Sequence, residues 1–264
     1  MRYWRDGPKE DGFETPTKCE CDMVTIIPVR GIGEVVPGED LVEVLRASIG
    51  ETQSDDILVV TQKIVSKAEG RFVELDHVTP DAEAMRLAEV TRKDPRLVAL
   101  VLAESSTVLR AVPHVLITRH RCGWVMANAG IDRSNIGPGG SERALLLPVD
   151  ADASAARLAR GLGIPVVISD SFGRPWRVGV TQVAIGAAGL PALIDSRGEK
   201  DRDDRTLEVT QVAFADLLAN AAGLVMGEGA EGIPAAIVRG LSPAAAPERP
   251  ASALNRPVSE DLFQ

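Results

Sequence analysis

Apolar and polar residues alternate along the chain in two distinct periods, which predict both strands and helices. Short runs rich in Val, Ile and Leu at 24–29, 57–60, 165–169, 180–185 and 233–238 are typical of strands. Apolar residues at helical spacing predict helices over 40–49, 153–162 and 214–225. The lysine-bearing segment 63–67 directly follows the strand at 57–60.

The middle of the chain has a different pattern. Thr79-Pro80-Asp81 indicates a helix start with proline at the first helical position, and Asp94-Pro95 indicates a second. Three short strands are then expected at 107–112, 115–118 and 124–127. Because these strands follow one another closely, the pattern favours antiparallel pairing.

The two ends of the chain lack these periods. Residues 1–22 are polar and rich in Gly, Pro and charges, which predicts a mobile N-terminal extension. Residues 243–264 are rich in Ala and Pro, which predicts a disordered tail. One folded domain is therefore expected over 23–242, with the charged segment 199–205 as a solvated connection.

Composition and charge narrow the class of partner. The 264 residues are 45% hydrophobic, carry a formal charge of −9 and contain only 3% aromatic residues. An acidic chain with few aromatics is not expected to bind nucleic acid. No apolar run is long enough to span a membrane and the N-terminus does not resemble a signal peptide, so we expect a cytoplasmic protein with small-molecule partners.

Candidate chemistry is concentrated in the segment 128–135, Asn-Ala-Gly-Ile-Asp-Arg-Ser-Asn, which follows the strand at 124–127. Its carboxylate and amides could contact a metal-bound phosphate. The alternative is that Asp132 and the asparagines only satisfy their own backbone in an Asx-type turn.

Three acids, Asp132, Asp170 and Glu228, each follow a predicted element. Carboxylates gathered within about 4 Å repel one another, so such a cluster is stable only around a cation. Oxygen ligands favour magnesium or manganese over zinc. The spacing along the chain does not show whether the three acids converge.

Glycines 227, 229 and 232 match the literal dinucleotide fingerprint, but they follow a predicted helix and precede a predicted strand. The fingerprint requires the opposite order, so a Rossmann site is rejected. The glycines could instead bring backbone N–H groups to phosphates, or simply end the helix.

Five segments, in this order, resemble the coenzyme F420-0:L-glutamate ligase family. They are 59–71, 128–135, 169–177, 226–229 and 232–240, within a match that runs from about Val24 to Leu241. The resemblance implies an α+β fold with mixed, largely antiparallel sheets, flanking helices and a homodimer. It also implies GTP-dependent addition of L-glutamate to the F420 precursor, F420-0, in coenzyme F420 biosynthesis.

The resemblance also implies roles for individual residues. Asp132 and Asp170 would bind one Mg²⁺ or Mn²⁺, and Ser171 and Glu228 a second. The family commonly has threonine at position 171; serine keeps the hydroxyl but lacks the β-branch that restricts its rotamer. Lys67, Asp132 and Asp170 would act in catalysis. The nucleotide would be held by Arg30, Gly31, Ile32, Gly33, Gln62, Lys63, Lys67, Asn135, Met226, Gly227, Glu228, Gly229, Ala230, Glu231, Gly232 and Ile233.

The implied reaction transfers a phosphoryl group from GTP to the carboxylate of the precursor, and the amine of glutamate then attacks the acyl phosphate. The sequence does not indicate which residue deprotonates glutamate. Two alternatives stay open: another metal- and nucleotide-dependent carboxylate-amine ligase, and a nucleotide-sensing protein without turnover. GTP rather than ATP rests on the resemblance alone.

Overall fold

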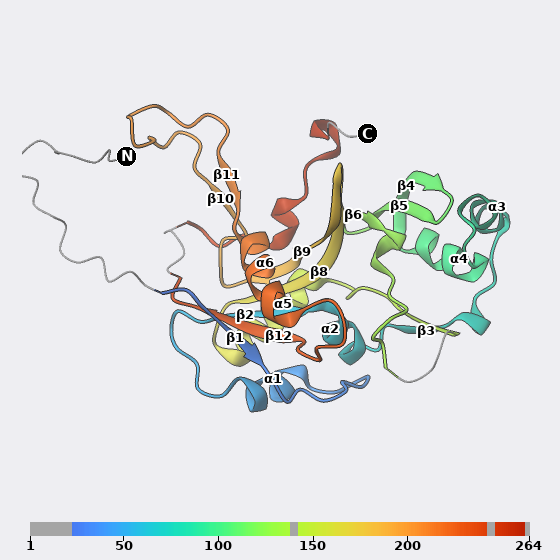
Figure 1. The fold of residues 1–264 in the computed structure, drawn as a ribbon, viewed down its shortest axis with the longest axis horizontal. Coiled ribbons are helices and arrows are strands. Elements are labelled where there is room, and N and C mark those ends of the chain that lie inside the picture. Colours follow the sequence, from blue (N-terminus) through green and yellow to red (C-terminus); the bar gives the residue numbers. More distant parts are fainter. Residues whose placement is uncertain (1–22, 138–141, 242–245, 262–264) are drawn as a thin grey trace, which may run out of the picture.

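The computed structural model describes residues 23–137, 142–241 and 246–261. Its centre is a five-stranded sheet (Figure 1). In spatial order the strands are β1 (Thr25–Val29), β12 (Ala235–Arg239), β2 (Ile57–Thr61), β8 (Val166–Arg174) and β9 (Arg177–Ala188). Only β2 and β8 run parallel within it. The predicted α+β class with mixed, largely antiparallel sheets is confirmed.

Helices cover both faces of this sheet because its strands are apolar on both sides. In β2, Leu58 and Val60 face one core and Ile57 and Val59 face the other, as the two-residue period of a strand requires. The first core is shared with α1 (Leu41–Ile49), α2 (Gln62–Ala68) and α5 (Ala151–Leu162). The second core is shared with α6 (Phe214–Met226).

A smaller lobe lies beside the main sheet and has its own core (Figure 1). It contains η1 (Leu75–His77), α3 (Ala82–Thr91), α4 (Pro95–Ala103), β4 (Ser105–Val112), β5 (Val115–His120), β6 (Val125–Ala127) and the pair β3 (Phe72–Glu74) and β7 (Arg143–Leu145). The antiparallel pairing predicted for the three consecutive strands is confirmed. The turn η2 (Asn128–Gly130) joins this lobe to the site.

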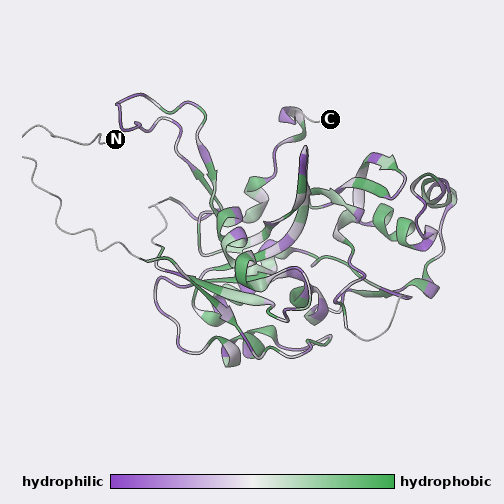
Figure 2. Cartoon of the chain, viewed as in Figure 1, coloured by the Kyte–Doolittle hydropathy of each residue, from purple (hydrophilic) through white to green (hydrophobic). Residues whose placement is uncertain are grey.

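A narrow arm projects from the main lobe, built on the pair β10 (Leu193–Asp195) and β11 (Gln211–Ala213). The segment 199–205 lies in its loop, where it is mostly exposed and hydrophilic (Figure 2). The charged segment is therefore a solvated connection, as predicted.

The two helix starts have different outcomes. Asp94 caps α4 by accepting from Arg96 N at 2.8 Å, and Pro95 is the first helical residue, as predicted. The start at 79–81 is placed wrongly, because Asp81 is itself the cap of α3 and accepts from Ala84 N at 2.7 Å. Pro80 thus lies before the cap and not at the first helical position.

The predicted strand at 165–169 is too short. Strand β8 continues to Arg174 because residues 169–174, although polar, pair with β9 as far as Arg177. Asp170 therefore lies inside a strand and not at its end. A shift in register between Ile168 and Ser169 marks the point where the buried strand becomes the wall of the site.

The extension at 1–22 lies outside the described residues. Of the tail at 243–264, predicted to be disordered, residues 246–261 are described and include η4 (Ala251–Leu254) and η5 (Val258–Glu260). Ala251 is buried in the second core, and its N–H donates to Asp152 Oδ1 at 2.8 Å. Small alanine side chains allow this close packing. No helix in the described ranges has both the length and the apolar character needed to cross a membrane.

Candidate functional site

A cavity of about 850 Å³ opens where the parallel pairing of β2 and β8 ends. Thr61 at the end of β2 is opposite Ser169 in β8, so the residues that follow, Gln62 and Asp170, both lie at the cavity. Crevices at the carboxyl ends of parallel strands are common ligand sites. The loop 226–234 and the segment 32–35 complete the walls.

Helix α2 begins immediately after β2 and presents its first turn to Asp132. Lys63 Nζ forms an ion pair with Asp132 Oδ1, and Gln62 Nε2 donates to Asp132 Oδ2. Ser66 Oγ in turn donates to Gln62 Oε1 at 2.9 Å, which orients the amide. The bonds of the Asp132 side chain thus lead to α2, and the Asx-turn interpretation does not describe this residue.

Lys67 lies one turn further along α2. Its side chain is only 7% exposed, and Nζ contacts Glu34 Oε1 at 2.6 Å. Glu34 was missed in the sequence, although it directly follows the segment 30–33 assigned to the nucleotide. Its carboxylate is half exposed, so Lys67 can exchange this partner for an anion that enters the cavity.

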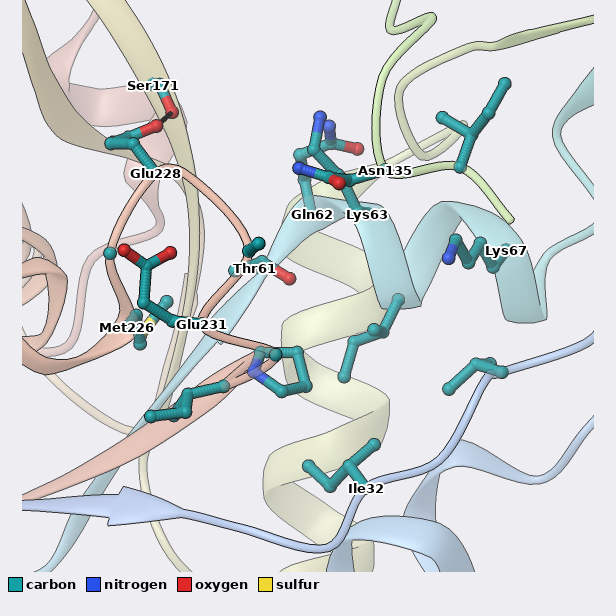
Figure 3. Close-up of a pocket in the computed structure, with 18 of the residues that line it drawn as sticks. Ile32, Thr61, Gln62, Lys63, Lys67, Asn135, Ser171, Met226, Glu228 and Glu231 are labelled. Atoms are coloured by element: carbon teal, nitrogen blue, oxygen red, sulfur yellow. Dashed lines mark hydrogen bonds between the residues drawn. The ribbon is translucent and has the colours of Figure 1, made fainter. Parts of the chain in front are cut away.

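Glu228 is held at the opposite side of the cavity opening (Figure 3). Ser171 Oγ donates to Glu228 Oε2 at 2.7 Å, and Gln182 Nε2 donates to Oε1. Gln182 was also missed, because a single glutamine in the strand at 180–185 carries no specific motif. With both oxygens bound, the carboxylate keeps one orientation beside Ser171.

The glycine loop is shaped around Glu231. Gly227 has φ of 72°, which favours glycine, and a Cβ there would lie 2.3 Å from Glu231 Cδ and displace that side chain. Gly229 N donates to Glu231 Oε2 at 2.8 Å, and Asn135 Nδ2 donates to Gly229 O at 3.0 Å. The loop follows α6 and precedes β12, as the rejection of a Rossmann site required.

Asp170 has the most perturbed carboxylate of the site. Burial, and next the negative charge of Asp132, raise the pKa of Asp170 to about 7, with a further contribution from Glu228. The Ser171 N–H and the Lys63 ammonium oppose the shift. Negative charges crowded in this way are relieved by a cation.

The donor set therefore fits the predicted metal ions. No three Asp, Glu, His or Cys side chains of the described residues surround a single point. Magnesium does not need such a cage, because it commonly takes one or two carboxylates and completes its shell with water and phosphate. Asp132 with Asp170, and Ser171 with Glu228, supply two ligands each. Binding of the ions stays a prediction.

Most of the residues assigned to the nucleotide line the cavity. They are Ile32, Gly33, Gln62, Lys63, Lys67, Asn135 and all residues from Met226 to Ile233. Arg30 and Gly31 do not line it. Ser169 does, and its buried hydroxyl has no hydrogen-bond partner among the described residues, a property that the sequence alone could not reveal.

Asp132 lines a second, smaller cavity of about 260 Å³ that adjoins the first. This cavity lies against the turn η2, where Asn128 and Ala129 have φ of 52° and 51°. Residues other than glycine rarely adopt this left-handed backbone conformation. Ala129 is fully buried in the core of the small lobe, which holds the turn in place.

The sequence is similar to those of known proteins. A family model described as F420-0:Gamma-glutamyl ligase matches residues 31–240. A coenzyme F420:L-glutamate ligase from Methanopyrus kandleri is 45% identical over 248 residues, covering 90% of this chain and 97% of the relative. Proteins of the same name from Methanothermobacter thermautotrophicus and Natronomonas pharaonis are 43% and 47% identical, over 82% and 81% of this chain and 89% and 85% of their own.

Proposed function

Because the chain belongs to the F420-0:gamma-glutamyl ligase family, we propose that it joins L-glutamate to the coenzyme F420 precursor, F420-0, at the expense of GTP. One observation supports this most directly. Asp132, Asp170 and Glu228, more than 90 residues apart in sequence from first to last, line the smaller cavity together, and it adjoins the larger cavity that receives Lys63 and Lys67. Acids and lysines in this arrangement suit phosphoryl transfer to a carboxylate.

Two divalent cations, Mg²⁺ or Mn²⁺, form part of the proposal. Asp132 and Asp170 would hold one, and Ser171 and Glu228 the other. When bound, such ions neutralise the charge on transferring phosphates. Lys63 at present pairs with Asp132, so it would become available to a phosphate once a cation takes over the carboxylate.

The remaining residues of the cavity would bind and orient. The Lys67 ammonium would exchange Glu34 for a phosphate oxygen, and the glycine loop would bring backbone N–H groups to the phosphates. The precursor carboxylate attacks the terminal phosphorus and displaces GDP, and the amine of glutamate then attacks the carbonyl carbon of the acyl phosphate and displaces phosphate as the amide forms. A homodimer in the cytoplasm, where GTP and glutamate are supplied, completes the proposal.

The test is direct. Metal-stripped protein is incubated with the F420 precursor and glutamate, with either GTP or ATP, and with or without Mn²⁺, and the product mass is followed. We expect a glutamate adduct only with GTP and the metal ion. A glutamate adduct formed with ATP in place of GTP would contradict the GTP dependence. No adduct under any condition would reject the ligase, and nucleotide binding without turnover would then favour a sensing protein.

A further inference from the structure

Residues 246–261, which we call the C-terminal strap, bond to both lobes although they lie beyond the family match, which ends at residue 240. The first half of the strap contacts the main lobe. The carboxylate of Asp152, in α5, accepts from Ala251 N at 2.8 Å and from Ser252 N at 3.1 Å. The side chain of Ala251 is buried in the second core. Backbone hydrogen bonds and packing thus fasten the strap to the main lobe.

The second half of the strap contacts the small lobe at β5 and at the turn between β5 and β6. Asn255 Nδ2 donates to Cys122 O at 3.1 Å, and a Cβ on Gly123 would lie 2.9 Å from the same nitrogen. Asp261 Oδ2 forms an ion pair with Arg119 Nη2 at 3.0 Å, and the two side chains are only 15% and 12% exposed. Breaking a pair shielded to this extent costs more than breaking an exposed pair.

The two acids assigned to one cation come from different lobes. Asp170 lies in β8 of the central sheet, whereas Asp132 follows η2, and its neighbour Ile131 is buried in the core of the small lobe. Two backbone hydrogen bonds of 2.9 Å with Leu145, in β7, also hold Asp132 within that lobe. The position of Asp132 relative to Asp170 therefore depends on how the small lobe is fixed against the central sheet.

We propose that the C-terminal strap is a clamp between the lobes that holds Asp132 in place beside Asp170. The strap grips β5 at Arg119, which is paired with Val125 of β6, and β6 leads directly into η2. Asn255 and Asp261 are positioning residues, since neither lines either cavity. This inference rests on the proposed function, because it assigns to the strap the placement of an acid that the proposed cation needs.

The experiment uses the full chain with Asn255→Ala and Asp261→Ala combined, which detaches the strap from the small lobe and keeps its contacts with the main lobe. The variant should fold, because Trp124 and Met126 still anchor β6 in the first core. In the metal-free variant we expect faster amide hydrogen exchange over residues 119–132. The half-saturating Mn²⁺ concentration, measured by EPR with a non-hydrolysable GTP analogue, should rise about 10-fold, as is typical when a group that orients metal ligands is lost.

Three further variants separate positioning from stability. Arg256→Ala changes an exposed residue that bonds to Glu260 O within the strap itself, and it should leave exchange and Mn²⁺ binding unchanged. Arg239→Gln breaks an ion pair whose partners lie outside the strap, so it should lower the Tm and leave the half-saturating Mn²⁺ concentration within about twofold of wild type. Asp261→Glu keeps the carboxylate and should need less Mn²⁺ than Asp261→Ala.

Exchange over 119–132 that matches the wild type would overturn the inference. Faster exchange with unchanged Mn²⁺ binding would also overturn it, since the strap would then stabilise the small lobe without positioning Asp132. A wild type that binds Mn²⁺ but forms no glutamate adduct rejects the ligase reaction alone. A wild type that binds no Mn²⁺ rejects the proposed cation site, and the exchange over 125–132 then decides by itself whether the strap holds this segment.

Discussion

Carboxylates at the cavity and carboxylates elsewhere in the fold have opposite surroundings. Asp56, before β2, is buried and receives both donors of the Arg239 fork, at 2.6 and 2.8 Å. The Arg239 hydrogen bonds hold the pKa of Asp56 below its usual range. At Asp170, burial and next the charge of Asp132 raise the pKa to about 7, with a further contribution from Glu228 and with Lys63 opposing the shift.

Glu104, at the end of α4, shows that burial alone does not explain the difference. Burial raises the pKa of its carboxylate, yet nearby His120 and then the charges of Arg121 and Arg71, each in contact at 3.0 Å, hold the pKa below the usual value. Cationic partners thus neutralise the acids that join elements of the fold. The charges that act on Asp170 are instead two other carboxylates and one lysine, an arrangement that a bound cation would relieve.

Replacing Asp170 with Asn tests the role of the acids at the cavity and should have the largest effect on ligase activity. Ligase activity is expected to fall about a thousandfold or more, because a charged group that neutralises the transferring phosphoryl carries an effect of this size. The Tm of the metal-free protein should not fall, because the variant removes a negative charge that Asp132 and Glu228 repel. Asp203→Asn, on the exposed arm, is the control and should keep full activity. Activity retained in Asp170→Asn would show that the metal site is elsewhere.

Replacing Arg239 with Gln tests the contribution of a buried acid and its arginine partner to the stability of the fold. Asp56 would be left buried without its partner, and we expect the Tm to fall by about 5–10 °C. Arg86→Gln breaks an exposed pair with Glu83 and should shift the Tm by less than about 2 °C. Both are measured by calorimetry. Equal shifts for the two variants would contradict the contrast between buried and exposed pairs.

The pH dependence of unfolding sharpens the same point. Because the pKa of Asp56 is lower in the folded protein than in the unfolded chain, its contribution is fully present above the unfolded pKa of about 4. It is lost as the pH falls through the lower folded value. Urea unfolding between pH 2 and 5 should therefore show a steeper loss of stability in the wild type than in Arg239→Gln. Parallel curves would assign the acid sensitivity to other groups.

Replacing Ser171 with Thr should have the smallest effect. Threonine keeps the hydroxyl that bonds Glu228, and its β-branch only restricts the rotamer, so we expect activity within about threefold of wild type. Ser171→Ala removes the hydroxyl and should raise the Mn²⁺ concentration needed for half-maximal activity. A metal requirement unchanged in the alanine variant would remove Ser171 from the ligand set.

Local sequence patterns predicted most helices and strands, but they did not predict the contacts between segments that are distant in sequence. Asp94-Pro95 begins α4 as expected, because a cap and a proline act on their own turn. Strand β8 was predicted too short because residues 170–174 are mostly polar, and their pairing with β9 depends on a segment that the local pattern does not include. Likewise the contacts of Asp132 with Lys63, and of Lys67 with Glu34, join separate segments and have no local pattern. Asp132, Asp170 and Glu228 could be nominated but not shown to converge.

The position of β12 has a consequence for how the protein is made. This strand, among the last residues of the domain to be synthesised, lies between β1 and β2, with Thr25 opposite Arg239. Strands β1 and β2 do not pair with each other, so they cannot be joined in the sheet until β12 has been synthesised. The central sheet can close only after residue 239 has left the exit tunnel, whereas the segment 72–147, which contains all strands of the small lobe, is available for folding much earlier.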